Sequence, residues 1–461
     1  MHNKKLITVL FLSFLLSGCT HNDIIIQSVL IDAGSNRSEL EAVLNHYRTT
    51  DPAPQKLLAA KFLIKNLSAH YSYANTEIHE YYDYASLVLS DKTLTPEQQR
   101  DSLLAITNSK YSDLPNQKTP DAQIIRADFL IENIDKSYEQ WKTCPWASQV
   151  TFDDYLEWML PYKAVELQEL DHWRDTLLNH FSDGLKKMIP NDVEYNTTIK
   201  VADIVRNEAQ FKLNRYGLYT RAGLPLLNAH LQASQTFGNI PDYALTAALT
   251  FRSVGIPVVL DETPVGSRGT AATRWFVLLS DRGKEIPSEW DFSSIPGWGF
   301  FPYERGPKVF RMTYAINKER MEYKKKAKFV YPFELARKDV TDRYFLTSNL
   351  DLPIKREYRK CLKDKYVYIA SAVRKNNDSA PNTLTPEPDG WKIVDFCKIK
   401  NRHANFKKMG REVMYLLLGY DGNGLIPITK PFILHKDGHI EPLDSGNTNL
   451  PQLDLFKNNT I

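Results

Sequence analysis

The pattern of the chain changes within the stretch Phe251-Arg252-Ser253-Val254-Gly255-Ile256-Pro257-Val258. Upstream of it, Asn239-Ile240-Pro241-Asp242 combines an N-cap residue, a proline in the first turn and an acidic side chain, which is typical of a helix start. Apolar residues from 244 to 254 continue with helical spacing. Gly255 and Pro257 end that helix, because glycine permits a left-handed C-cap and proline cannot continue a helix. The stretch therefore predicts a helix that is followed at once by another kind of element.

The chain after this stretch has the pattern of β-strands. Segments 256–260 and 274–279 are rich in β-branched and aromatic residues. Asp281-Arg282-Gly283 predicts a turn into a third strand near 284–290. A helix docked on an antiparallel sheet is an α+β core, and we place this core at residues 191–325.

Two further regions flank the predicted core. Residues 36–190 show helical periodicity and helix-start signals such as Thr95-Pro96-Glu97, and they predict an α-helical domain. Residues 326–461 show short apolar segments separated by turns such as Asp421-Gly422-Asn423-Gly424, and they predict a C-terminal β-sandwich. The fold class is therefore α+β, with a number of domains that suits a chain of 461 residues.

The first twenty residues have the pattern of an export signal. Two lysines precede an apolar run from Leu6 to Leu16, which is too short to span a bilayer. The sequence Leu16-Ser17-Gly18-Cys19 resembles the bacterial lipobox, which implies cleavage before Cys19 and attachment of lipid to that residue. We therefore predict a signal peptide at 1–18, a tether at 19–35 and a lipid-anchored protein of the cell envelope, on the periplasmic or the outer face of the outer membrane.

The overall charge gives no reason to expect a nucleic-acid partner. Lys and Arg number 58 and Asp and Glu number 55, which gives a formal net charge of +3. Loss of Lys4 and Lys5 with the signal peptide leaves the mature chain close to neutral. Binding to a phosphate backbone requires a concentrated positive surface, so we predict that no nucleic acid is bound. We predict contact with the membrane through the N-terminal lipid anchor.

Several segments resemble the transglutaminase-like lipoproteins common in Bacteroides and related gut bacteria. The resemblance is carried by His46-Tyr47-Arg48, Ala59 to Leu67, His70-Tyr71-Ser72, Ala127-Asp128-Phe129-Leu130, Phe152-Asp153-Asp154-Tyr155, Leu160-Pro161-Tyr162-Lys163, Trp173-Arg174, the stretch 251–258 and Asp339-Val340-Thr341. These segments span nearly all of the mature chain. The resemblance implies a papain-like, transglutaminase-like core between the helical domain and the β-sandwich.

A core of that family implies a Cys-His-Asp arrangement, in which a thiolate at a helix N-terminus attacks an amide carbonyl. Here the position of the Cys is Ile240, and that of the His, two residues before Trp275, is Thr273. Glu289 fills the acidic position, with Asp291 as the alternative register. Isoleucine has no nucleophilic atom, and a threonine hydroxyl is not a base near neutral pH.

The distribution of Cys and His supports the same interpretation. No Cys lies between residues 145 and 360, and no His lies between 231 and 402. A shift of register within the core therefore supplies no Cys-His pair. We predict a degenerate core without catalytic residues, cofactor or metal, in which Ile240, Thr273 and Glu289 mark the former triad.

The remaining cysteines offer two weaker candidates. Cys144 with His172 or His180 is a Cys-His combination in the helical half, but a buried structural thiol is the expected role of Cys144. Cys361 and Cys397 fall near strands of one domain, so the sequence leaves open a disulfide or two free thiols.

Two surface features are expected to be ordinary. His435, Asp437 and His439 surround an Asp-Gly turn, and we expect a solvated hairpin tip rather than a metal site, which would require both His side chains to face one way. The run Lys324-Lys325-Lys326 with Lys328 is expected to be a solvated face, with anionic headgroups as the alternative partner.

Aromatic residues follow the predicted sheet where a substrate cleft of that family would open. Trp275, Trp290, Trp298 and Tyr303 are the candidate ligand-binding residues, and a packed aromatic loop is the alternative. The leading hypothesis is a non-catalytic envelope lipoprotein that binds a peptide or glycan. The alternatives are an active cysteine amidase, peptidase or transglutaminase of the same fold, and a structural component of a surface protein assembly.

Overall fold

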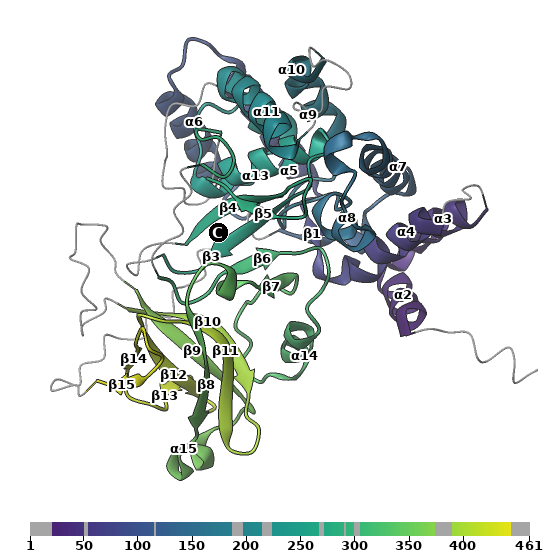
Figure 1. Cartoon of the computed structure of the whole chain (residues 1–461). Coiled ribbons are helices and arrows are strands. Elements are labelled where there is room, and N and C mark those ends of the chain that lie inside the picture. The colour runs from purple at the N-terminus through teal and green to yellow at the C-terminus, as the bar shows by residue number, and fades with distance from the viewer. Residues whose placement is uncertain are drawn as a thin grey trace, which may run out of the picture.

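Helices dominate the first half of the chain and strands the second, so the protein has a mixed α+β structure (Figure 1). The computed structural model describes residues 21–49, 54–114, 117–186, 197–213, 224–266, 272–289, 292–298, 305–373 and 390–443. None of the helices in these ranges is both long enough and apolar enough to cross a bilayer.

Eleven described α-helices precede helix α13 and the core sheet. They are α2 (His21–Asp32), α3 (Arg37–Thr49), α4 (Pro54–Asn66), α5 (Thr76–Ser90), α6 (Pro96–Lys110), α7 (Ala127–Thr143), α8 (Phe152–Trp158), α9 (Trp173–Phe181), α10 (Asp183–Lys186), α11 (Thr198–Leu213) and α12 (Ala229–Ser234). The side chain of Thr95 caps α6 and that of Thr151 caps α8, because each accepts a hydrogen bond from the backbone N–H three residues later. The helix start predicted at Thr95 is confirmed.

The segment predicted to be a tether, 19–35, instead contains helix α2. Ile26, Val29 and Leu30 are buried in the same apolar cluster as residues of α3 and α4. Lys61 Nζ on α4 lies 3.1 Å from Asp23 Oδ1 on α2. Burial of these three apolar side chains favours a packed helix over an extended spacer, so this prediction was wrong from residue 21 onward.

A five-stranded antiparallel sheet follows helix α13 (Ile240–Ser253). Its strand order is β5-β4-β3-β6-β7. The strands are β3 (Val258–Thr263), β4 (Thr273–Leu279), β5 (Glu285–Pro287), β6 (Phe310–Met312) and β7 (Arg337–Asp339). The expected helix followed by an antiparallel sheet is confirmed, although β3 begins two residues later than predicted and continues through Asp261 and Glu262.

Helices cover both faces of this sheet. Phe276 and Leu278 of β4 belong to an apolar cluster with α9, α11, α12 and α13. Trp275 and Val277 belong to a second cluster, with α2, α3, α4, α7 and α8. Successive side chains of a strand point to opposite faces, so the sheet lies between these two groups of helices. The predicted helical domain and core therefore share continuous apolar packing.

The strands after β7, which is itself preceded by helix α14 (Lys318–Lys326), form two antiparallel sheets. The larger has the order β10-β9-β12-β14-β15, with β13 also paired to β12, and the smaller pairs β11 with β8. The strands are β8 (Thr347–Pro353), β9 (Tyr366–Val373), β10 (Gly390–Lys398), β11 (His403–Gly410), β12 (Val413–Tyr420), β13 (Leu425–Pro427), β14 (Phe432–Leu434) and β15 (Ile440–Pro442), with helix α15 (Arg356–Cys361) before β9. Side chains of both sheets meet in one apolar cluster. Figure 1 shows these strands gathered apart from helices α2–α13, with α14 and α15 beside them.

The two cysteines of this region are free thiols. Cys397 on β10 is buried, and Cys361 is partly buried at the end of α15, where its thiol donates to Tyr358 O at 3.1 Å. The disulfide that the sequence left open is therefore absent, and the alternative of two free thiols is the correct one.

Candidate functional site

The N-terminus of α13 is where the resemblance places a nucleophile. The Asn239 side chain accepts a hydrogen bond from the N–H of Asp242 at 2.9 Å, and the Asp242 carboxylate accepts from the N–H of Asn239 at 3.2 Å. This capping box fixes Ile240 as the first helical residue. The Ile240 side chain is partly buried and purely hydrocarbon, so the helix start is present without a nucleophilic atom.

Strand β3 runs back along α13 toward this N-terminus. The Arg252 guanidinium in the last turn of α13 donates to Val258 O at 2.8 Å, which holds the start of β3 at the C-terminal end of the helix. The helix has 14 residues and the strand has 6, so each spans roughly 20 Å. Thr263, and Thr273 opposite it on β4, therefore lie toward the N-terminal end of α13.

The two faces of β4 separate Thr273 from α13. Phe276 and Leu278 pack in the cluster that contains α13, whereas Trp275 and Val277 pack in the other cluster. By this alternation Arg274 faces α13, and Thr273 faces the opposite group of helices. The structure therefore does not bring Ile240 and Thr273 together across the interface of α13 with the sheet.

The position that faces α13 is part of a buried ion-pair cluster, which we call the Glu262 cluster (Glu262, Arg274, Arg337 and Glu334). Glu262 Oε2 lies 2.6 Å from Arg274 Nη2, and Glu262 Oε1 lies 2.9 Å from Arg337 Nη1. Arg337 Nε donates to Glu334 Oε2 at 2.6 Å. The side chains of Glu262, Arg274 and Arg337 are only 6%, 8% and 10% exposed.

The cluster keeps its carboxylate charged. Burial alone would raise the pKa of Glu262, but the charges and hydrogen bonds of Arg337 and Arg274 outweigh burial and lower that pKa. Both oxygens of the Glu262 carboxylate accept hydrogen bonds from arginines. The cluster is therefore structural, and it was not predicted from the sequence, where the first strand was expected to end at residue 260.

Glu289 follows β5 at the same end of the sheet. Ser288 N donates to Phe276 O at 3.0 Å, and continuing this antiparallel register places Glu289 opposite Trp275. Glu289 is partly buried. The alternative, Asp291, lies outside the described residues. Residue 240 is an isoleucine, and residue 273 is a threonine on the other face of the sheet. Neither position of the former triad therefore supplies an imidazole that Glu289 could orient.

Three segments that carry the family resemblance meet around Arg252. Its Nη1 donates to Pro161 O at 3.3 Å and to Lys163 O at 3.1 Å. Arg174 Nη2 donates to Met159 O at 2.6 Å, and its Nη1 donates to Arg252 O at 3.4 Å. Burial lowers the pKa of Arg252 to about 10 and, together with the charge of Arg252, that of Arg174 to about 9. The two guanidiniums thus join the core to the chain segment 159–163.

A second buried charge cluster joins other segments of the resemblance. Lys163 Nζ lies 2.6 Å from Asp121 Oδ2 and donates to Tyr71 O at 2.8 Å. His70 Nδ1 is 2.8 Å from Glu166 Oε1, and His70 Nε2 is 2.9 Å from Tyr314 O. The Lys163 and Asp121 side chains are 2% and 0% exposed. Lys163 and His70 are thus held by groups of the fold itself, although Asp121 Oδ1 is buried without a hydrogen-bond partner among the described residues. We assign this cluster a structural role.

Cys144 is packed against the end of α13. Gly255 has φ +77°, and a Cβ at this position would lie 2.7 Å from Cys144 Sγ. Only glycine suits this left-handed, closely approached position. Burial raises the pKa of the Cys144 thiol to about 11, so the thiol stays protonated near neutral pH.

The two histidines proposed as partners of Cys144 have other contacts. His172 Nδ1 lies 3.0 Å from Glu132 Oε2, and the His180 ring packs edge-on against Phe181. Within the described residues no hydrogen bond joins either imidazole to Cys144, whose Sγ lies 4.0 Å from Val254 O. A protonated thiol without a neighbouring base matches the structural role expected from the sequence.

The aromatic candidates divide into a buried and an exposed position. Trp275 is 4% exposed, and its Nε1 donates to Tyr344 OH at 3.1 Å, so it is a core residue. Trp298 is 73% exposed. Its loop is fixed to the sheet, because Gly297 N donates to Ser288 Oγ at 3.2 Å and Trp298 N donates to Ile295 O at 2.8 Å. Trp290, Tyr303 and the lipidation residue Cys19 lie outside the described residues.

The basic run on α14 is mainly exposed. Lys324, Lys325 and Lys326 lie in its last turn. Lys326 Nζ pairs with Glu322 Oε1 at 3.0 Å, and the Lys324 ammonium lies over the Tyr71 ring at 5.9 Å. Lysines at a helix C-terminus are stabilised by the helix dipole. The exposed positions of these lysines are those expected for a solvated helix face.

Comparison with known proteins gives no relative for this chain, since it matches no family model, no curated protein and no solved structure.

Proposed function

We propose that this chain is a non-catalytic, transglutaminase-like lipoprotein of the cell envelope that binds a peptide or glycan. In this proposal α13 with β3–β7 is the degenerate core, the helices before it form the helical domain, and β8–β15 form the β-sandwich. Cys19 carries the lipid anchor.

The observation that carries the proposal is that structural side chains occupy the face of the sheet beside α13. Where a Cys-His enzyme would need a thiolate and an imidazole, the chain has Ile240 and the Glu262 cluster. A buried carboxylate held by two guanidiniums cannot act as a general base, because its pKa is lowered and its oxygens are engaged. The protonated thiol of Cys144 gives no support to the alternative of an active cysteine enzyme.

The binding surface that we propose is the loop segment 292–298, which carries Trp298. An indole that is 73% exposed on a loop held by backbone hydrogen bonds can stack on a sugar ring or an apolar peptide side chain at small conformational cost. Ile295 on the same loop is 37% exposed and extends the apolar area.

The test is a glycan and peptide array probed with the full chain in detergent. We expect a reproducible ligand whose affinity falls at least about tenfold in Trp298→Ala, since truncation of an aromatic anchor commonly costs 1.4 kcal/mol or more. The matched control is Phe211→Ala, which removes an aromatic side chain that is 87% exposed on α11.

Two outcomes would reject the proposal. Equal binding by the Trp298→Ala and unsubstituted chains would show that this loop is not the binding surface. Turnover of an amide substrate that survives Cys144→Ala would show that the chain has a catalytic site elsewhere, which would reject a non-catalytic function.

A further inference from the structure

The hairpin between β14 and β15 brings two histidines opposite each other. His435 N donates to His439 O at 3.0 Å, and Gly438 N donates to His435 O at 2.9 Å. Gly438 has φ +92°, which the tight turn requires. The antiparallel register of Leu434 with Ile440 continues into this turn, so His435 and His439 are directly opposed. Directly opposed residues of a hairpin share one face.

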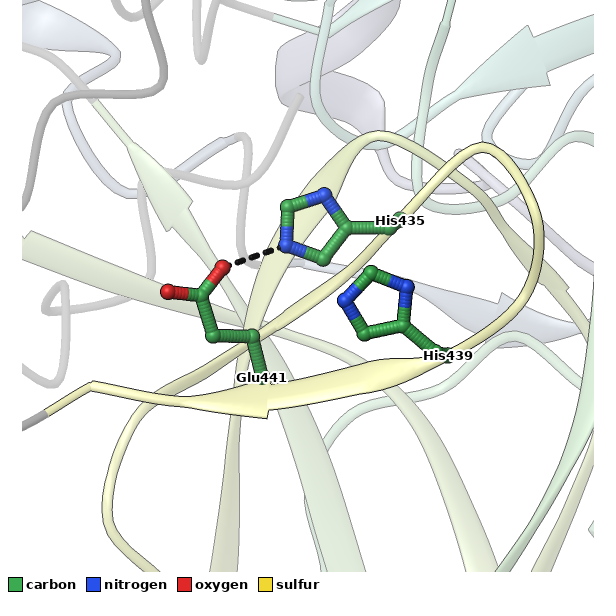
Figure 2. A group of neighbouring side chains, drawn as sticks. All are labelled: His435, His439 and Glu441. Atoms are coloured by element: carbon green, nitrogen blue, oxygen red, sulfur yellow. Dashed lines mark hydrogen bonds and ion pairs between the residues drawn. The ribbon is translucent and has the colours of Figure 1, made fainter.

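Both imidazoles and one carboxylate lie on that face (Figure 2). The rings of His435 and His439 are nearly parallel, at 11°, with their centroids 4.2 Å apart. Glu441 is two residues beyond His439 and so points to the same side. Its Oε2 lies 2.5 Å from His435 Nε2, and one ligand atom from each of the three residues lies within 4.8 Å of the others.

Asp437 fixes the protonation of one imidazole. Its Oδ1 lies 2.6 Å from His439 Nδ1 and accepts from the backbone N–H of His439 at 3.0 Å. A carboxylate only accepts, so Nδ1 of His439 carries the hydrogen and Nε2 keeps its lone pair. A carboxylate that orients a histidine in this way is the usual outer partner of a metal-bound imidazole.

We propose that His435, His439 and Glu441 bind a divalent transition-metal ion, with Asp437 orienting His439. This site is separate from the binding function proposed for the Trp298 loop. Two imidazoles and one carboxylate suit Zn²⁺, Cu²⁺ or Ni²⁺ better than Mg²⁺ or Ca²⁺, which prefer oxygen ligands. On binding, the ion takes the place of the hydrogen between His435 Nε2 and Glu441, and the neutral imidazole of His435 then carries its one hydrogen on Nδ1.

The size and charge of the cluster fit such an ion. Ligand atoms of a tetrahedral zinc site lie roughly 3.4 Å apart at about 2.1 Å from the metal. The separation of 2.5 Å between His435 Nε2 and Glu441 Oε2 must therefore widen, and any separation near the 4.8 Å limit must shorten. The side chains are 28%, 53% and 58% exposed for His435, Glu441 and His439, and they can make this adjustment. The carboxylates of Glu441 and Asp437 balance the two charges of the ion. Three protein ligands leave a position for water or an external ligand.

The test is titration of the metal-free full chain, without a polyhistidine tag, with ZnCl₂ in an isothermal calorimeter. We expect one zinc ion per chain, with affinity reduced at least about thirtyfold in His435→Ala and in His439→Ala. Asp437→Asn is expected to weaken binding about tenfold, the usual effect of losing an outer-shell carboxylate. Titration with MgCl₂ is expected to give no binding at this site.

His403→Ala is the matched control. His403 Nδ1 lies 2.9 Å from Asp351 Oδ1, and the His403 side chain is 42% exposed, so it resembles the His439 pair but lacks a second histidine. Its substitution is expected to leave zinc affinity unchanged. A Cu²⁺ complex of the unsubstituted chain is expected to show coupling to two imidazole nitrogens in its electron paramagnetic resonance spectrum. Zinc binding that persists unchanged in His439→Ala, or no stoichiometric binding at all, would overturn the proposal.

Discussion

The Glu262 cluster and the hairpin site (His435, His439 and Glu441) are built by the same device but have opposite consequences. In each, two residues that are directly opposed in an antiparallel ladder place polar side chains on one face: Glu262 with Arg274, and His435 with His439. The Glu262 cluster is buried, and each carboxylate oxygen of Glu262 accepts from an arginine. The hairpin groups are solvent-accessible, and His439 keeps a lone pair for a ligand.

This difference indicates that two properties separate a structural charge cluster from one that can bind a ligand. The structural cluster is buried, and its charged groups are paired with one another. Removing one member of a buried pair leaves an uncompensated charge in a medium of low polarity, whereas water replaces the missing member at the surface. The residue types alone do not distinguish the two cases.

Breaking the Glu262 cluster is expected to give the largest effect. Glu262→Gln leaves Arg274 and Arg337 buried beside a neutral amide, and we expect a loss of about 3–5 kcal/mol in the free energy of unfolding, measured with urea at pH 7. Glu441→Gln on the hairpin is the control and is expected to change it by less than about 0.5 kcal/mol. Equal losses in the two variants would remove the contrast between the clusters.

The pH dependence of that variant sharpens the same contrast. The pKa of Glu262 is lowered in the folded chain, so its contribution is complete above the unfolded-state pKa near 4.5 and is lost as the pH falls below it. The advantage of the unsubstituted chain over Glu262→Gln is therefore expected to shrink between about pH 5 and pH 2.

Asp171 is a buried carboxyl for which no ion pair is found among the described residues. We expect its substitution to have the next largest effect on the free energy of unfolding. Its Oδ2 accepts from Ala229 N at 3.0 Å, whereas its Oδ1 is buried and has no hydrogen-bond partner among the described residues. Burial, reinforced by the charge of Glu169, raises the pKa of Asp171 to about 7. The folded chain therefore prefers the neutral carboxyl.

Asp171→Asn is expected to stabilise the protein at pH 8 by about 2–4 kcal/mol, because a shift of one pKa unit corresponds to about 1.4 kcal/mol. The raised pKa gives stability that is fully present below the unfolded value near 3.8 and is lost as the pH rises to 7. The gap between the variant and the unsubstituted chain should therefore open from about pH 4 to pH 7 in urea unfolding curves. A gap that does not vary with pH would contradict this assignment.

The smallest effect on the protein is expected at Cys144, where the measured quantity is the rate of alkylation of its thiol. With a pKa of about 11, the thiolate fraction at pH 8 is roughly a hundredfold below that of an unperturbed thiol. Iodoacetamide should therefore alkylate Cys144 in the native chain at least about a hundredfold more slowly than in urea, as measured by mass spectrometry. Rapid labelling of native Cys144 would revive the alternative of an active cysteine enzyme.

The sequence predicted the elements that depend on local signals. The capped start of α13 and its glycine stop were predicted because each depends on a few adjacent residues. The β-hairpin at Asp437-Gly438 was predicted for the same reason. The end of β3 was missed because Asp261 and Glu262 resemble exposed loop residues until their partners Arg311 and Arg274 are known.

The candidate sites were harder to predict because they depend on which face a side chain occupies. Thr273 was placed by its distance in sequence from Trp275, but strand alternation turns both away from α13. At the hairpin, His435 and His439 were recognised from the sequence but Glu441 was not. Glu441 lies two residues after His439, and this spacing, which puts both side chains on one face of a strand, could have identified it. Cross-strand register, which the sequence does not state, decides both cases.

Helix α2 has a consequence for the proposed lipid anchor. The helix begins at His21, two residues after Cys19, and its buried face joins it to α3 and α4. If Cys19 carries the acyl chains, the backbone between that residue and the start of α2 reaches at most about 7 Å. The body would then be unable to search the surrounding space, and one fixed side of the helical bundle would lie against the lipid headgroups.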